Sequence, residues 1–108
     1  MTNTTLPTIA DSASIEMYRA IALSTAHITV EDNDVLQTAS DDPENNVVMS
    51  RESGFLVKLS ALDSADNLRY VVSEEAKNIL RWAETMGCRL VEFDNAASEI
   101  DGFPIFDW

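Results

Sequence analysis

The residues best suited to chemistry in this sequence stand together in Ser24-Thr25-Ala26-His27. His27 is the only histidine of the chain, and an imidazole can act as a general acid or base near neutral pH. A hydroxyl within hydrogen-bond reach of it would be a candidate nucleophile, so the candidate catalytic group is His27 with Thr25 or Ser24. Only Thr25 would share a strand face with His27, because neighbours in a strand point to opposite sides. We favour the plainer interpretation, a half-buried histidine bonded to a neighbouring carbonyl or hydroxyl, and expect no enzyme.

A second kind of chemistry is electrostatic. The 108 residues include 19 acidic and 7 basic ones, a formal net charge of -12. One stretch carries six acids and no base: Glu31, Asp32, Asp34, Asp41, Asp42 and Glu44. Such a face can steer toward a positively charged groove, including one that normally holds nucleic acid, with carboxylates in the place of phosphates. These six residues are the predicted partner-binding set; the alternative is that they serve solubility alone.

Composition excludes several other functions. The charge opposes direct binding to nucleic acid or to an anionic membrane. A single cysteine, Cys88, excludes an intrachain disulfide and a cysteine-based zinc site, and we expect it in the core.

The C-terminal acids match no calcium loop and are interpreted as a solvated acidic loop: Asp94, Glu99, Asp101 and Asp107. We therefore expect no metal and no cofactor. No apolar run is long enough for a bilayer and the start lacks signal-peptide features, so a cytoplasmic protein is expected.

The first half of the chain must position these groups. Residues 1–14 read as a flexible N-terminal arm, followed by a single domain over residues 15–108. Residues 18–28 alternate like a strand, with a helix over residues 15–23 as the rival interpretation. Thr29 resembles an N-cap with Asp32 completing a capping box, which predicts a helix that ends near Ser40.

The second half contains a hairpin, a helix and a strand. Residues 47–52 and 55–59 read as two strands, with Gly54 supplying the positive φ of a tight turn. Their core face is predicted from the alternation: Val47, Met49, Phe55, Val57 and Leu59. An amphipathic helix is expected between the N-cap Ser73 and the C-cap glycine Gly87. Residues 88–93 follow as a buried strand.

The element order is strand, helix, strand, strand, helix, strand. This order is typical of the ferredoxin-like split βαβ arrangement, so we predict an α+β fold with a four-stranded antiparallel sheet and two helices on one face. The end of the chain, Phe103 to Trp108, is too apolar for a free tail. We expect it either to dock on the core or to form an interface with a partner.

Several of these segments resemble a small family of unknown function carried on proteobacterial plasmids, prophages and genomic islands. The resemblance spans about residues 18 to 108, and its most specific elements are Ser-Thr-Ala-His at 24–27 and the closing Asp107-Trp108. It implies a shared pattern that includes Ser24, Thr25, His27, Asp94, Asp107 and Trp108. The resemblance supplies a setting, mobile DNA, and no reaction.

Charge and setting together favour a binding protein. The leading hypothesis is a mobile-element protein that blocks a basic, nucleic-acid-binding surface of a host defence or DNA-processing complex, in the manner of anti-CRISPR or anti-restriction proteins. The alternatives are the small enzyme built on His27 and a non-catalytic assembly or toxin–antitoxin accessory domain. A dimer through a sheet edge or through the C-terminal tail is compatible with either binding hypothesis.

Overall fold

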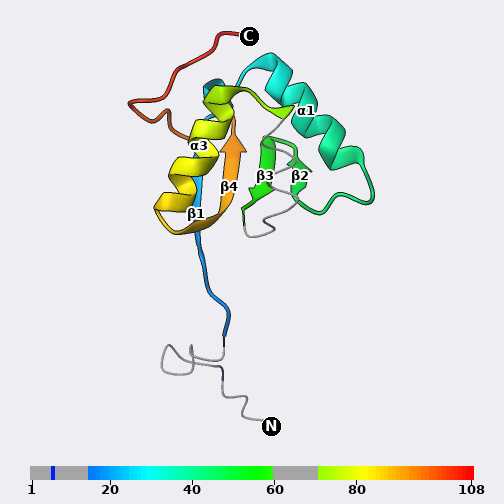
Figure 1. Ribbon diagram of the computed structural model, residues 1–108, viewed down its shortest axis with the longest axis vertical. Helices are drawn as coiled ribbons and strands as arrows, with labels where there is room; N and C mark the ends of the chain where they lie inside the picture. Colours follow the sequence, from blue (N-terminus) through cyan, green and yellow to red (C-terminus); the bar gives the residue numbers. More distant parts are fainter. Residues whose placement is uncertain (1–5, 7–14, 60–70) are drawn as a thin grey trace.

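The computed structural model describes residue 6, residues 15–59 and residues 71–108. Apart from Leu6, the arm predicted over residues 1–14 lies outside the described residues. The described chain forms the elements drawn in Figure 1, in this order: β1 (Arg19–Leu23), the 3-10 turn η2 (Thr25–His27), α1 (Val30–Asp41), β2 (Val48–Arg51), β3 (Gly54–Lys58), α3 (Glu74–Thr85) and β4 (Cys88–Asp94).

The first strand is shorter than the alternation predicts. Strand β1 ends at Leu23, and η2 takes the place of its expected second half. The rival helix over residues 15–23 is not formed. The turn is stabilised at its start, where the Ser24 hydroxyl accepts the N–H of Ala26 at 3.1 Å. This turn carries His27 off the strand, so the predicted sharing of a strand face by Thr25 and His27 is wrong.

The sheet has the strand order β1-β4-β3-β2. Strand β1 runs parallel to β4, with Leu23 beside Phe93, whereas β4 pairs with β3 and β3 with β2 in antiparallel fashion. The predicted fully antiparallel, ferredoxin-like sheet is therefore wrong, although the α+β class and the four strands are confirmed. The two most buried strands, β3 and β4, occupy the centre, and β1 takes an edge with its small Ala20 and Ala22 exposed.

Gly54 explains how the two central strands come together. A Cβ at this position would lie 1.8 Å from the carbonyl oxygen of Phe93, and the backbone φ is +155°. Only glycine fits without moving one strand away from the other. The predicted hairpin is confirmed, and its glycine is needed for the close approach of β4 as well as for the turn.

Both predicted helix starts are confirmed. Thr29 caps α1 in a reciprocal capping box with Asp32, and Ser73 caps α3 through a hydrogen bond from Ala76. Gly87 follows α3 with a φ of +82°, in the left-handed conformation expected of a glycine after a helix. No helix in the described ranges is both long and apolar enough to cross a membrane.

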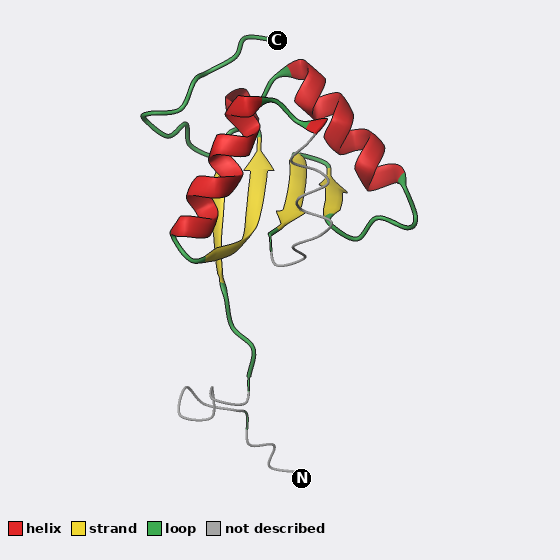
Figure 2. Ribbon diagram, viewed as in Figure 1, coloured by secondary structure: helices red, strands yellow, loops and turns green. Residues whose placement is uncertain are grey.

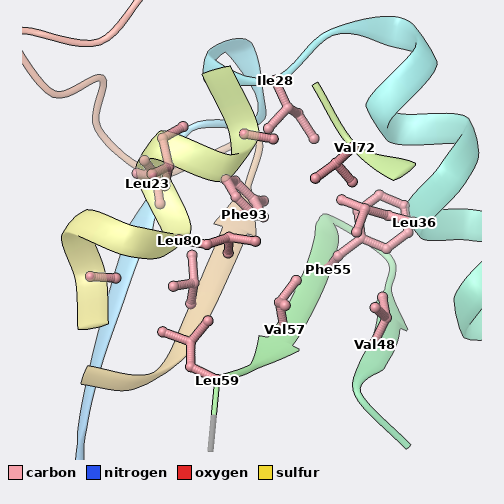
Figure 3. Packing of buried hydrophobic residues seen from close by; sticks show 14 of the residues in the cluster. Leu23, Ile28, Leu36, Val48, Phe55, Val57, Leu59, Val72, Leu80 and Phe93 are labelled. Atoms are coloured by element: carbon pink, nitrogen blue, oxygen red, sulfur yellow. The ribbon is translucent and has the colours of Figure 1, made fainter. Parts of the chain in front are cut away.

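The core lies between the sheet and the two helices (Figure 2). Figure 3 shows Leu36 of α1 beside Phe55, and Leu80 of α3 near Phe93. Cys88 is buried, as expected. On β2 the inward position expected for Met49 is wrong: Met49 is 42% exposed, whereas Val48, which pairs with Val57, is buried. Val47 and Val48 are adjacent at the start of the predicted strand, so the sequence alternation does not show which of the two faces the core.

Candidate functional site

His27 is completely buried, and main-chain groups of the C-terminal segment occupy both of its ring nitrogens. Its Nδ1 donates to the carbonyl oxygen of Pro104 at 2.8 Å, and its Nε2 accepts the N–H of Ile100 at 2.8 Å. These two partners fix the tautomer with the proton on Nδ1. The ring also meets Phe103 edge-on, with 5.9 Å between centroids. His27 therefore ties residues 100–104 to the turn η2.

The candidate catalytic group is not assembled in this arrangement. Neither ring nitrogen of His27 is free to exchange a proton with a substrate, because both already hold backbone groups. The Ser24 hydroxyl bonds to the Ala26 N–H, and no hydrogen bond joins Ser24 or Thr25 to the imidazole among the described residues. The plainer interpretation of a bonded, buried histidine agrees with the geometry.

The C-terminal segment docks along η2 through a series of hydrogen bonds. Ser98 accepts from the N–H of Ser24 at 3.1 Å, and Phe106 donates its N–H to Ala26 at 2.7 Å. The Trp108 indole N–H reaches the carbonyl oxygen of Ile28 at 2.8 Å. The segment is thus held in place, yet Trp108 keeps 53% of its surface exposed. The docking expected of this tail is present, but it rests on hydrogen bonds more than on burial of its last residues.

Asp32 differs from the other five predicted partner-binding residues. It is only 2% exposed. Its carboxylate accepts the Thr29 N–H at 3.1 Å, the Ser73 N–H at 2.7 Å and the Ser73 hydroxyl. One side chain thereby completes the capping of α1 and holds the N-cap residue of α3. Asp32 joins the two helices and is not available to a partner surface.

The remaining five acids are exposed and are here called the acidic ridge: Glu31, Asp34, Asp41, Asp42 and Glu44. Three of them, Glu31, Asp34 and Asp41, fall on one side of α1, because residues three, seven and ten apart return to the same face of a helix. Asp42 is the C-cap of α1, and Glu44 follows it in the next loop. The acidic ridge therefore runs along the helix and past its C-terminal end.

In the part of the chain that the structure describes, no basic side chain forms an ion pair with the acidic ridge. The ion pairs among the described residues lie elsewhere, between Arg51 and Glu92 and between Glu74 and the pair Lys77 and Arg81. The last turn of α1 contains no basic residue. The carboxylates of Asp41 and Asp42 thus stand at the negative end of the helix dipole, which is an unfavourable place for negative charge. Asp41 accepts a hydrogen bond from the Gln37 amide at 3.1 Å, and Asp42 accepts one from the Glu44 N–H at 2.9 Å. A neutral amide oxygen would accept either bond, so these contacts do not require the negative charges.

A polar cleft of about 530 Å³ opens at the end of β1. Its walls come from η2, α1, the β2–β3 turn, the residue after β4 and the end of the chain. Ser24 and Thr25 line it, and His27 does not. Sequence reasoning missed Asn33, Ser53 and Asn95, which line the cleft from three separate elements. No spacing pattern connects such residues before the fold brings them together.

The C-terminal acids form no metal site. Within residue 6 and the ranges 15–59 and 71–108, no group of three or more potential metal-ligating side chains is close enough to hold an ion. Asp94 instead accepts the N–H of Ala96 at 2.8 Å, which stabilises the turn after β4.

Fold and site together define a small α+β domain with a mixed four-stranded sheet, a histidine that holds the C-terminal segment, an acidic ridge and an open polar cleft. The family described as "Family of unknown function (DUF5983) C-terminal domain" matches residues 20–108, and the chain belongs to this family. No curated protein and no solved structure was found to match the chain. The family match begins at the second residue of β1 and covers all the later elements.

Proposed function

We propose that this protein is a binding protein that presents the acidic ridge to a basic surface of a partner. The observation that carries the proposal is the run of exposed carboxylates along α1, which form no ion pair with any basic residue that the structure describes. Asp41 and Asp42 lie where the helix dipole opposes them, so a role in association accounts for them better than a role in folding. A surface of this kind raises the rate of encounter with a cationic partner and suppresses encounters with anionic ones.

The partner we propose is a nucleic-acid-binding complex. Carboxylates spaced along a helix can occupy the positions of phosphates in a basic groove, and the net charge of -12 favours such a groove over nucleic acid itself. The resemblance to proteins of plasmids, prophages and genomic islands adds a setting in which a host defence or DNA-processing complex is a natural target. The proposed activity is therefore of the anti-CRISPR or anti-restriction type and takes place in the cytoplasm. It requires a target whose nucleic-acid-binding groove is accessible.

The experiment compares two variants with the same change in charge. The ridge variant carries Asp34→Asn, Asp41→Asn, Asp42→Asn and Glu44→Gln, and leaves Glu31 in place because it stabilises the first turn of α1. The control variant carries Glu16→Gln, Glu99→Gln, Asp101→Asn and Asp107→Asn, all at exposed positions. Wild type and both variants are immobilised, host lysate is passed over them at low salt, and the retained proteins are eluted with salt and identified.

We expect the wild type and the control variant to retain the same basic protein or complex and the ridge variant to lose it. Retention should disappear near 0.5 M salt, where the Debye length is roughly 4 Å. Duplex DNA should displace the partner if the contacted surface is its nucleic-acid site. Equal retention by the ridge variant, or retention unchanged at high salt, contradicts the proposal. Release by salt without displacement by DNA contradicts DNA mimicry and favours an assembly or toxin–antitoxin accessory role.

A further inference from the structure

The polar cleft contains hydrogen-bonding groups that the fold does not use. Four of its lining residues carry a hydroxyl or amide side chain and come from four different segments of the chain: Thr25, Asn33, Ser53 and Asn95. Each can both donate and accept hydrogen bonds. None of them takes part in a side-chain hydrogen bond in the described part of the chain, whereas the buried His27 nearby has both ring nitrogens occupied. These four side chains therefore keep hydrogen-bonding capacity that a ligand in the cleft would use.

An aromatic wall stands on another side of the same cleft. Phe106 and Trp108 line it. Both are held by the fold, Phe106 through its N–H to Ala26 at 2.7 Å and Trp108 through its indole N–H to Ile28 at 2.8 Å. Trp108 nevertheless leaves 53% of its surface exposed. A large aromatic ring that is fixed in orientation and open to solvent offers a flat apolar surface at little entropic cost.

The charges of the cleft disfavour an anionic ligand. Arg51 and Glu52 are the charged residues that line it, one of each sign. The Arg51 guanidinium already pairs with Glu92 at 3.3 Å. No unpaired cation remains in the lining to hold an anion, and the net charge of -12 repels one.

We propose that the polar cleft binds a neutral saccharide. A sugar ring carries hydroxyls around its edge, each a donor and an acceptor, and an apolar face of C–H groups. Side chains that both donate and accept match the hydroxyls, and the aromatic wall matches the apolar face. A nucleobase suits the cleft less well, because its hydrogen-bonding groups all lie in the plane of the ring, whereas sugar hydroxyls project to several sides. The volume of about 530 Å³ accommodates a small ligand.

The test is an NMR titration of the ¹⁵N-labelled full chain. The probes are methyl glycosides of glucose, galactose, mannose and N-acetylglucosamine, with adenosine and uridine as the rival arm. We expect at least one glycoside at about 20 mM, a range suited to weak binding, to shift the backbone signals of Thr25, Asn33 and Asn95 and the indole signal of Trp108. Maltose and chitobiose then distinguish a free sugar from the end of a glycan, since a glycan end binds more tightly as the disaccharide.

Matched variants connect the binding to the cleft. The variant Asn33→Ala with Asn95→Ala removes two free amides, and we expect its affinity for the glycoside to fall about tenfold, as two lost hydrogen bonds imply. The control, Asn46→Ala with Asn78→Ala, removes two exposed amides outside the cleft and should bind as the wild type does. The proposal is overturned if no glycoside shifts these signals, if only a nucleoside does, or if the cleft variant binds unchanged. The ridge variant keeps the cleft side chains, so this result is independent of the proposed basic partner.

Discussion

Asp32 and Asp34 lie two residues apart on α1 but differ in burial and in the contacts of their carboxylates. The carboxylate of Asp32 is buried and accepts hydrogen bonds from Thr29 and Ser73, which ties the starts of two helices together. The carboxylate of Asp34 is exposed, belongs to the acidic ridge and has no ion pair in the described part of the chain. Residue type and local spacing are nearly the same, so the difference comes from the side of the helix on which each one falls.

His27 and Trp108 extend this comparison to the end of the chain. His27 belongs with Asp32, because its polar atoms are fully used by the backbone. Trp108 resembles Asp32 in that its indole N–H is hydrogen-bonded within the fold, and it resembles Asp34 in that about half of its surface is exposed. Side chains whose polar atoms are all used inside the fold should affect stability, and exposed, unpaired ones should affect binding. Three single substitutions and the ridge variant test this division.

The largest expected effect is that of His27→Ala. The change removes a fully buried ring and leaves the N–H of Ile100 and the carbonyl of Pro104 without their partner. We expect the free energy of unfolding to fall by about 3–5 kcal/mol, measured by urea denaturation. A loss below about 1 kcal/mol would show that the C-terminal segment holds η2 without the imidazole and would reopen a functional role for His27.

Asp32→Ala should rank second. It removes the side chain that serves the N-terminal ends of α1 and α3, and we expect a loss of about 2–3 kcal/mol in the same measurement. The matched control is Asp34→Ala, which should change stability by less than about 0.5 kcal/mol. A double-mutant cycle of Asp32→Ala with Ser73→Ala should give a coupling of about 1 kcal/mol; additive effects would mean that the two helix starts are independent.

Trp108→Phe separates the hydrogen bond from the aromatic surface. The ring is kept and the bond to the Ile28 carbonyl is lost, so we expect unfolding free energy to fall by about 1 kcal/mol. Ile105→Ala is the control, because this residue is 59% exposed and should change stability by less than about 0.5 kcal/mol. Deleting residues 105–108 extends the test: loss of folding identifies the segment as structural, and loss of association alone identifies it as an interface.

The ridge variant should have the smallest effect on stability. Its four substitutions lie at exposed positions, and removing the charges of Asp41 and Asp42 relieves their contact with the negative end of α1. We expect the midpoint of urea unfolding to stay the same or to rise slightly, while capture of a basic partner is lost. A clear fall in stability would mean that the acidic ridge, like Asp32 and His27, stabilises the fold. The basis for a binding role would then be removed.

Local sequence determined much of the secondary structure. The caps Thr29 and Ser73, the glycine after α3 and the Gly54 hairpin all depend on contacts within a few residues, and each was predictable for that reason. The existence of an exposed acidic helix was predictable too, because charge and its spacing are properties of the sequence. The buried position of Cys88 followed from its place between a helix end and a strand.

Tertiary structure decided the rest, because it depends on pairing between distant segments. The order of the strands, with β1 parallel to β4, cannot be read from alternation, since several pairings bury the same residues. The two hydrogen bonds that occupy the ring nitrogens of His27 come from Ile100 and Pro104, which are 73 and 77 residues away in the chain. Asp32 meets Ser73 across 41 residues, and the polar cleft draws its side chains from separate elements. A local pattern shows which groups are present, and only the packed chain determines which of them remain free to act.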